Sequence, residues 1–506
     1  MSVRAVVPWA LSAASGLLVW LGFAGVDLWP LALVAFVPFF FALERGARVG
    51  GGRACLLGLL FGGVAMACGY HWLLATLQRF SGLPAAGCLA LAVLFWLHHG
   101  GQLALFGWLW WRARRAGAPA ALAAPVAFAA VELCYPRVFP AYYGASFHPV
   151  PLALQIAELG GPILLGALCL ATNGALYELC AAWHSGEARR SAVAVAGCVA
   201  LALVYGAVRM PQVERAAQGA PHLRVGIVQP NMGASAKWSR PREGQRRLVE
   251  ASRALEASVR PDLIVWPETA YAAGLPARLE RVPGAVTGGL QSALLFGSVA
   301  RLPAQGGEPR VLNRVYLVAA GGELRGSYDK VNLVAFSESL PGADRFVWLR
   351  RLSPRRAHFV PGSHVRPLPF REFRISALVC FEDVLPRFVR RVMREASPHL
   401  LVNLTNDAWF GDTHEPWIHL ALAQLRAVEQ RRYLVRATNS GVSAVIDPLG
   451  RVVVRSGAFT RETLHAEVAM LQGRTPYQVL GDWPGWLSLA AILWLAFLRR
   501  PSADGG

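Results

Sequence analysis

Long apolar blocks, separated by short arginine-containing segments, fill the chain up to about residue 210, and one more block lies near the C-terminus. A helix that crosses the hydrocarbon core of a bilayer needs about 20 mostly apolar residues, and these blocks reach that length. Residues 222–470 instead mix polar and apolar side chains as a water-exposed domain does. The sequence therefore predicts a seven-span membrane domain at 1–211, a folded domain at 222–470 and an eighth span at 479–498.

A chain of 506 residues that is 54% hydrophobic is too apolar for one soluble globule. The predicted spans differ in length, and some are longer than a single crossing of the membrane needs. The first block is too long, and too closely followed by others, for a cleaved signal peptide. Two blocks, 84–111 and 151–182, exceed one span and are expected to tilt or to carry interfacial or re-entrant pieces. The eight predicted spans are 5–25, 28–44, 53–76, 84–111, 118–136, 151–182, 191–210 and 479–498.

Arginine placement orients these spans. With a cytoplasmic N-terminus, eleven arginines fall in cytoplasmic segments, whereas the short outside loops hold only Arg79 and Arg137. This positive-inside bias places 222–470 outside the cytoplasm, tied to the bilayer at both ends. The net charge of +19 is then explained by the orientation of the spans, and the expected partner of the basic residues is an anionic lipid surface. We therefore expect no nucleic-acid partner. The eleven are Arg4, Arg45, Arg48, Arg53, Arg112, Arg114, Arg115, Arg189, Arg190, Arg499 and Arg500.

The 222–470 segment alternates predicted strands and helices, which favours mixed sheets with helices outside them. Its only cysteine is Cys380, because the other seven lie in or beside apolar blocks. No CxxC pair or metal-like Cys/His spacing occurs, so we expect neither a disulfide framework nor a metal site here. The predicted strands are 223–228, 262–266, 294–299, 375–379 and 400–404, the helices 243–258 and 416–430, and the hairpins 315–328 and 442–454.

Three side chains that suit a nucleophile, a cation and a base stand at the end of an apolar strand or just beyond a hairpin. Glu268 follows a strand in Trp266-Pro267-Glu268-Thr269, Lys330 follows the first hairpin, and Cys380 ends a strand. A thiolate can hold an acyl chain as a thioester. A nearby ammonium lowers the thiol pKa and can stabilise an oxyanion, and a carboxylate can take the thiol proton. Together they describe acyl transfer through a covalent intermediate.

These segments resemble the nitrilase superfamily of carbon–nitrogen hydrolases, through Trp266-Pro267-Glu268, Asp329-Lys330-Val331-Asn332-Leu333 and Val379-Cys380-Phe381-Glu382. The stretches 144–146 and 154–161 are similar to the segment before the sixth span of bacterial apolipoprotein N-acyltransferases. The resemblance implies an α-helical membrane bundle of about eight spans plus an α/β nitrilase-like α-β-β-α sandwich. It further implies transfer of an acyl chain from a phospholipid, typically phosphatidylethanolamine, to the diacylglyceryl-cysteine of an apolipoprotein, at the periplasmic face of a bacterial inner membrane, without a cofactor.

The resemblance also assigns site residues. Glu268 is expected to be the base, Lys330 the oxyanion stabiliser and Cys380 the nucleophile. Two carboxylates, Glu338 and Glu382, match supporting residues of the family. The expected substrate-binding residues are Trp238 in Lys237-Trp238 and Phe381, which stands where the family often has Tyr. The chain also departs from the family's usual Pro-Phe-Gly-Glu pattern, because it reads Ala335-Phe336-Ser337-Glu338.

Other interpretations of the same residues stay open. Taken alone, Cys380 is better interpreted as a core thiol, Glu382 can also be a partner of Arg387, and Trp238 can equally be an interfacial anchor. In the spans, His98-His99 and Glu132 suit contacts with a neighbouring helix better than a metal or proton path. The basic stretch 344–358 is either an arm on lipid headgroups or a solvated loop, and Arg387–Arg394 is expected to form a solvated helix face. As whole functions, a membrane-tethered amidase and a non-enzymatic lipid-binding protein are the alternatives.

Overall fold

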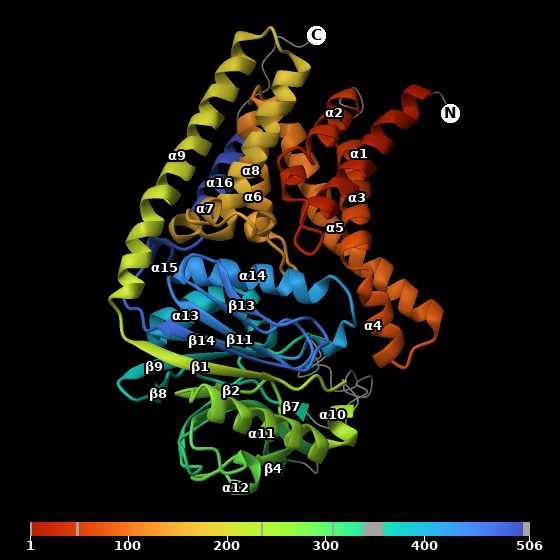
Figure 1. Cartoon of the computed structure of the whole chain (residues 1–506). Helices are drawn as coiled ribbons and strands as arrows, with labels where there is room; N and C mark the ends of the chain where they lie inside the picture. The colour runs from red at the N-terminus through yellow and green to blue at the C-terminus, as the bar shows by residue number, and fades with distance from the viewer. Residues whose placement is uncertain are drawn as a thin grey trace. The chain divides into compact units, whose positions relative to one another are not determined.

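The computed structural model describes residues 3–46, 50–233, 236–305, 308–335, 338–339 and 358–498 (Figure 1). Contacts divide the chain into two compact units. The first comprises Met1–Pro211 with Thr475–Gly506, and the second comprises Gln212–Arg474. The first is helical, and the second contains both β-sheets.

Apolar helices build the first unit. Five of the described helices are long and apolar enough to cross a membrane: Ala5–Gly22, Gly50–Gly69, Ala85–Arg115, Ala157–Ala181 and Gly186–Gln218. The element bounds are α1 (Val3–Gly22), η1 (Trp29–Leu33), α2 (Val37–Gly46), α3 (Gly50–Gly69), α4 (Trp72–Phe80), α5 (Ala85–Arg115), α6 (Ala120–Cys134), η2 (Tyr143–Phe147), α7 (Pro151–Leu154), α8 (Ala157–Ala181), α9 (Gly186–Gln218), α15 (Pro476–Leu480), α16 (Trp483–Leu493) and η6 (Trp494–Leu498).

The second predicted span is wrong as a single continuous helix. Residues 28–44 form the 3-10 helix η1 and then the ten-residue helix α2, with a break between them. Proline stands near the start of each piece, where its fixed φ and missing N–H favour a new helix over a continued one. The long block 151–182 is likewise interrupted: Gly161 has a φ of 68° inside α8. The total of eight spans therefore stays a prediction.

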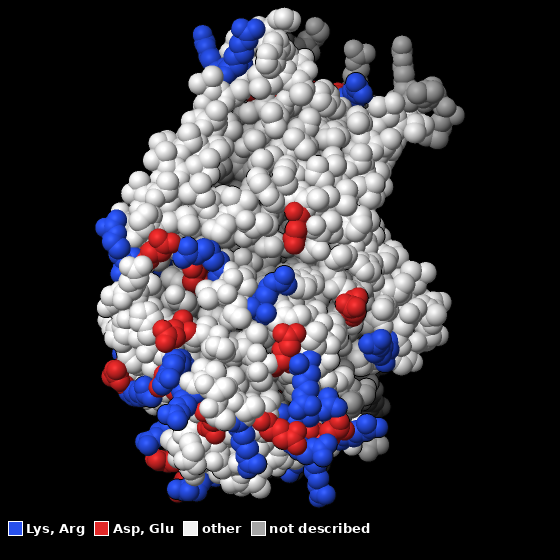
Figure 2. Space-filling model, viewed as in Figure 1, with Lys and Arg blue, Asp and Glu red and all other residues white. Residues whose placement is uncertain are grey.

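Small residues allow α3 and α5 to approach closely. A Cβ added to Gly58 or Gly62 would collide with the backbone of Leu103 or Gly100. Helices in lipid gain no hydrophobic driving force from each other, so close backbone packing through glycine is a common way to hold them together. On the face shown in Figure 2, charged side chains gather over the second unit and are scarce over the middle of the helical unit.

Two sheets form the centre of the second unit. The first has the order β14-β1-β2-β4-β5-β6, with β3 on β4 and β7 on β5, and the second has the order β13-β12-β11-β10-β9-β8. Their bounds are β1 (His222–Gln229), β2 (Leu263–Val265), β3 (Tyr271–Pro276), β4 (Ala293–Gln305), β5 (Glu308–Val318), β6 (Leu324–Asp329), β7 (His358–Phe359), β8 (Leu368–Phe370), β9 (Phe373–Val379), β10 (Leu400–Thr405), β11 (Tyr433–Thr438), β12 (Ala444–Ile446), β13 (Val452–Arg455) and β14 (Glu462–Ala469).

Alternating side chains of β2 show how the layers pack. Leu263 and Val265 join the core that also contains residues of the second sheet, whereas Ile264 and Trp266 join the core beneath α11. The second sheet is covered on its other side by α13 and α14, whose apolar residues belong to the shared core. The unit is thus an α-β-β-α sandwich, as predicted. Its helices are α10 (Ala236–Ser239), α11 (Pro241–Ser258), α12 (Gly284–Thr287), η4 (Cys380–Val384), α13 (Pro386–Ala396), η5 (Asp407–Trp409) and α14 (Glu415–Gln430).

Every predicted strand, helix and hairpin of this unit is present, with ends shifted by a few residues or, for β4 and β5, more. The strands β3, β7, β8, β11 and β14 were not predicted from the sequence. The helix α13 carries Arg387 and Arg394 on its exposed side while Phe388, Val389 and Val392 are buried, so the predicted solvated face is confirmed.

Candidate active site

Cys380 stands at the turn from β9 into η4 and is half-buried. Its φ is 56°, in the left-handed region that residues with a side chain seldom adopt. The next strand of the sheet stabilises this turn, because the Asn403 side-chain amide in β10 donates to the carbonyl of Cys380 at 2.8 Å. The thiol is therefore presented at a strand end by a strained and supported backbone.

Glu268 is presented by a comparable turn after β2. The following residue, Thr269, has a φ of 44°, and Gly297 in β4 lies directly against this turn. A Cβ on Gly297 would come within 2.8 Å of the Glu268 Cα, so only glycine leaves room there. The buried ammonium of Lys237 donates to the Glu268 carbonyl at 3.0 Å and to the Thr269 hydroxyl.

Lys330 lies between two carboxylates. Its Nζ is 2.7 Å from Glu338 Oε2 and 3.8 Å from Glu268 Oε1, and all three side chains are almost fully buried. The Asn313 amide in β5 donates to both carboxylates, at 2.7 Å to Glu268 and 3.1 Å to Glu338. The fold thus brings together three residues that are separated by up to 70 positions in the sequence.

The pKa values of Glu268 and Glu338 are shifted in opposite directions. Burial and the nearby Glu338 raise the pKa of Glu268, and Lys330 opposes this rise only partly. Burial also favours protonation of Glu338, but Lys330 and a backbone N–H at Val334 outweigh it and lower the pKa of Glu338. Glu338 is therefore suited to remain ionised beside Lys330, and Glu268 to exchange a proton.

Burial and the two neighbouring charged groups act on the pKa of the Cys380 thiol in different directions. Burial raises the pKa of Cys380, Glu268 raises it further, and the Lys330 ammonium opposes these two effects without overcoming them. The predicted effect of a nearby ammonium is therefore present, but burial outweighs it. A thiol in this environment needs a base to react as a thiolate.

Glu382 joins the Cys380 turn to the Lys330 segment. Its carboxylate accepts the backbone N–H of Val379 at 2.8 Å, those of Val331 and Asn332 at 2.9 Å, and the Tyr328 hydroxyl at 2.9 Å. Burial raises the pKa of Glu382 to about 7 against the effect of these donors. All of these donors lie in the two segments, which favours a structural clamp over the alternative pairing with Arg387.

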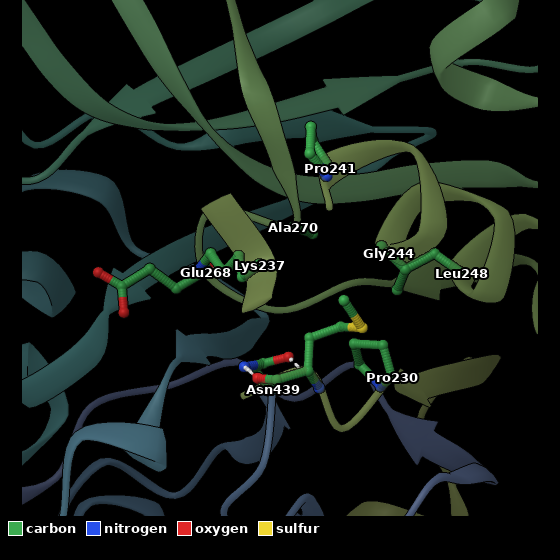
Figure 3. Close-up of a pocket in the computed structure, with 9 residues that line it drawn as sticks. Pro230, Lys237, Pro241, Gly244, Leu248, Glu268, Ala270 and Asn439 are labelled. Carbon is green, nitrogen blue, oxygen red and sulfur yellow. Dashed lines mark hydrogen bonds between the residues drawn. The ribbon is translucent and has the colours of Figure 1, made fainter. Parts of the chain in front are cut away.

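The two predicted substrate-binding aromatics lie differently. The ring of Phe381 has the Lys330 Nζ 5.8 Å from its centre, so Phe381 borders the site. Trp238 is 48% exposed on α10. Its neighbour Lys237, not Trp238, lines a cavity of about 10 Å³ beside Glu268, with Asn439 and apolar side chains around it (Figure 3). Burial lowers the pKa of Lys237 to about 8.

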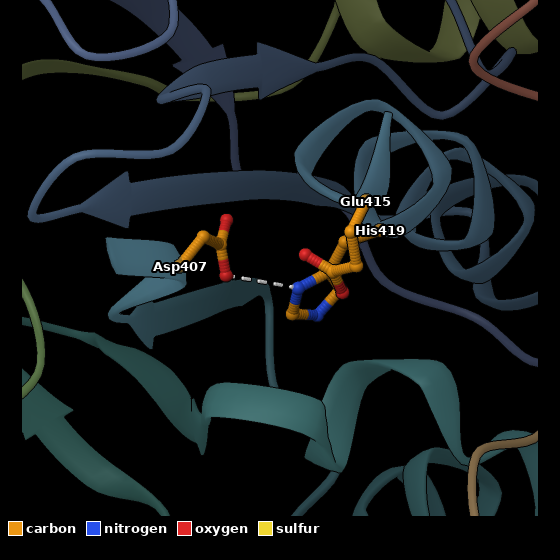
Figure 4. A group of neighbouring side chains, drawn as sticks. All are labelled: Asp407, Glu415 and His419. Atoms are coloured by element: carbon orange, nitrogen blue, oxygen red, sulfur yellow. Dashed lines mark hydrogen bonds and ion pairs between the residues drawn. The ribbon is translucent and has the colours of Figure 1, made fainter. Parts of the chain in front are cut away.

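Asp407, Glu415 and His419 are close enough to hold a cation (Figure 4). The charges of Asp407 and His419 are already engaged, however. His419 contacts Asp383 at 2.8 Å and Asp407 at 3.2 Å, and Arg436 pairs with the same two aspartates at 2.9 and 2.8 Å. A metal ion would lie next to the buried guanidinium of Arg436, so the arrangement suits an ion-pair network better than a metal centre.

Sequence reasoning did not single out Lys237, Asn313, Asn403 or Tyr328. Lys237 and Tyr328 adjoin residues of the family motifs, whereas the two asparagines carry no local signal. The residues Phe336 and Ser337, where the chain departs from the family pattern, lie outside the described residues, and so does nearly all of the basic stretch 344–358.

Both units have relatives among known protein families. Residues 224–475 match the carbon–nitrogen hydrolase family, and residues 15–175 match the apolipoprotein N-acyltransferase N-terminal domain. Similar solved structures include a carbon–nitrogen hydrolase superfamily protein from Xanthomonas campestris, 19% identical with a TM-score of 0.37 over 56% of this chain and 100% of that one. An amidase from Nesterenkonia sp. is 22% identical, with a TM-score of 0.35 over 50% of this chain and 91% of that one. The match of residues 224–475 identifies the second unit as a carbon–nitrogen hydrolase domain.

Full-length relatives narrow this class. The apolipoprotein N-acyltransferase of Azotobacter vinelandii is 35% identical over 97% of this chain and 95% of its own length. Those of Geobacter metallireducens and Pseudomonas syringae pv. tomato are 30% and 32% identical, each over at least 95% of both chains. The chain belongs to the apolipoprotein N-acyltransferase family.

Proposed function

We propose that the protein moves a fatty acyl chain from a membrane phospholipid to the α-amino group of a diacylglyceryl-modified apolipoprotein, through a thioester on Cys380. The observation that carries the proposal is the buried Lys330, held between Glu268 and Glu338 beside the thiol. In this proposal, residues 222–470 form the catalytic domain, and residues 1–211 and 479–498 form the membrane part. Phosphatidylethanolamine is the preferred candidate for the donor.

In the first half-reaction, Glu268 takes the Cys380 proton as the sulfur attacks the ester carbonyl of the donor. The new C–S bond forms, the oxyanion develops near Lys330, and the ester C–O bond breaks. The lysophospholipid oxygen leaves with the proton held by Glu268. The raised pKa of Glu268 supports this role, because a carboxyl that exchanges a proton in each direction works best when its pKa lies near the ambient pH.

In the second half-reaction, the apolipoprotein amine attacks the thioester. Glu268 takes the amine proton, the C–N bond forms, the C–S bond breaks, and the leaving thiolate recovers the proton. Glu338 keeps Lys330 charged and in place throughout, which its lowered pKa and 2.7 Å contact support. A single site visited in turn by two lipid substrates implies ping-pong kinetics.

The proposed location is a bacterial inner membrane, with the catalytic domain on the periplasmic side. Five helices of spanning length and the arginine bias support a membrane protein of this orientation. The domain is linked to predicted spans at both ends, so lipid substrates can reach it from the bilayer.

Trapping the intermediate tests the function. Protein incubated in detergent with phosphatidylethanolamine alone should gain one fatty-acyl mass on Cys380 that hydroxylamine removes. A diacylated lipopeptide should then discharge it with an amide at the peptide N-terminus. Release of free fatty acid without amide formation would favour the amidase alternative, and acyl transfer only when both substrates are present would contradict the covalent route. Cys380→Ser is the matched control.

A further inference from the structure

Asn403, in β10, lies between the nucleophile turn and the buried ion-pair network. Its side-chain Nδ2 donates to the carbonyl of Cys380 at 2.8 Å and, at 3.4 Å, to that of Leu378. Its Oδ1 accepts from the Arg436 guanidinium at 3.0 Å. Both Asn403 and Arg436 are completely buried, so no water competes for these contacts.

Arg436 decides which way the Asn403 amide faces. A guanidinium has only donors, so it can contact the amide oxygen and not the amide nitrogen. The NH₂ group must then face the carbonyl of Cys380. Arg436 cannot turn away, because Asp383 holds it at 2.9 Å and Asp407 at 2.8 Å, and His419 bonds to both aspartates.

We propose that Asn403, oriented by Arg436, is a positioning residue that fixes the presentation of the Cys380 thiol. Cys380 adopts a φ of 56°, which is unfavourable for a residue with a side chain and needs surrounding contacts to persist. The bond from Asn403 holds the Cys380 carbonyl and with it the plane of the peptide that joins Cys380 to Phe381. The inference rests on the proposed role of Cys380 as nucleophile.

Asn403→Asp tests the positioning role. The carboxylate has nearly the shape of the amide and keeps a partner in Arg436, but it sets an acceptor oxygen against the Cys380 carbonyl instead of a donor. With phosphatidylethanolamine bearing a fluorescent acyl chain and full-length protein in detergent, single-turnover acylation of Cys380 should slow about 100-fold. The donor concentration for half-maximal rate should change little, whereas the thermal midpoint should fall, because a buried acceptor then faces a carbonyl.

Arg436→Lys has a matched control in Arg426→Lys. Arg426 is also completely buried and pairs with a carboxylate, Glu429, at 2.5 Å, but on α14. Both changes replace a planar fork of donors with a single ammonium and should lower the thermal midpoint. Only Arg436→Lys should also slow acylation. In the double variant, Arg436→Lys should slow acylation little beyond the effect of Asn403→Asp alone, because both changes act through one chain of contacts.

Three results would overturn the inference: Asn403→Asp acylating at the wild-type rate, equal slowing by the two arginine variants, or fully multiplicative effects in the double variant. A wild-type protein that forms no thioester would instead contradict the proposed function. The positioning role would then be decided by alkylation of Cys380 with iodoacetamide, which Asn403→Asp should slow and Arg426→Lys should leave unchanged. An unchanged alkylation rate in Asn403→Asp would then overturn it.

Discussion

The hydroxyl of Tyr328 lies 2.9 Å from both carboxylate oxygens of Glu382, and this contact joins the first sheet to the second at the active site. Tyr328 is at the end of β6, two residues before Lys330, and Glu382 is two residues after Cys380. This contact thus adds to the backbone bonds from Val331 and Asn332 to Glu382 that set the relative placement of the cation and the nucleophile.

Tyr328→Phe tests this pair. The change leaves the ring and removes one charge-assisted hydrogen bond, so we expect a loss of about 1.5–3 kcal/mol in stability and slower acylation of Cys380. Thermal unfolding and single-turnover kinetics on the same preparation measure both. Tyr316→Phe, also buried in the first sheet, serves as the control. Equal acylation rates in both variants and the wild type would show that the Tyr328–Glu382 contact does not affect acylation.

Glu268→Gln should abolish thioester formation. The amide keeps the shape of the carboxyl but cannot accept the thiol proton, and loss of a general base costs a factor of about 100–10,000. Intact-protein mass spectrometry after incubation with phospholipid checks the outcome. The protein should still unfold cooperatively, and detection of normal acylation in this variant would assign the base elsewhere.

Asn313→Leu should shift the acid limb of the acylation rate to higher pH. The Asn313 amide lowers the pKa of Glu268 by donating to its carboxylate, and leucine of similar size cannot. Glu268 must be ionised to act as base, so activity is lost as pH falls through its pKa, and a higher pKa moves that loss upward. A pH–rate profile with an unmoved acid limb would contradict the electrostatic role of Asn313.

His419 should make stability depend on alkaline pH. Burial lowers the proton affinity of its ring, but Asp383 and Asp407 reverse this and raise the pKa of His419 from 6.5 to about 10. A group with a raised folded-state pKa stabilises fully below its unfolded pKa and loses that contribution as pH rises through the folded value. Wild-type stability should therefore decline, relative to His419→Gln, between pH 6.5 and about 10. Thermal midpoints of the wild type and His419→Gln across this range test the prediction. Midpoints that change in parallel for the two proteins would contradict stabilisation by the ion pairs of His419.

Reporter fusions test the predicted orientation. A reporter active only outside the cytoplasm should be active when fused at Arg215 and silent when fused at Ala113, between Arg112 and Arg114. The expectation follows from the eleven-to-two arginine bias. The reverse pattern would place the catalytic domain in the cytoplasm.

Much of the fold follows from local sequence patterns. Apolar blocks of spanning length indicate the helical unit, and alternating apolar runs indicate strands such as β1 and β9, because both periodicities are properties of short segments. Motifs at strand ends indicate Glu268, Lys330 and Cys380, since a strand end is recognisable without its neighbours. The strands β3, β7, β8, β11 and β14 carry no comparable local pattern, because pairing partners, not their own composition, make them strands.

By itself, then, the sequence determined the two-part architecture, the sandwich and the three candidate catalytic residues. Only the tertiary structure decided that 28–44 is broken, that Asn313 donates to both Glu268 and Glu338, and that Asn403 faces Cys380. It also showed that burial outweighs the effect of Lys330 on the thiol pKa. The physical reason is common to these results: hydrogen bonding, burial and electrostatic balance are sums over neighbours that are distant in the chain, and no local pattern contains those sums.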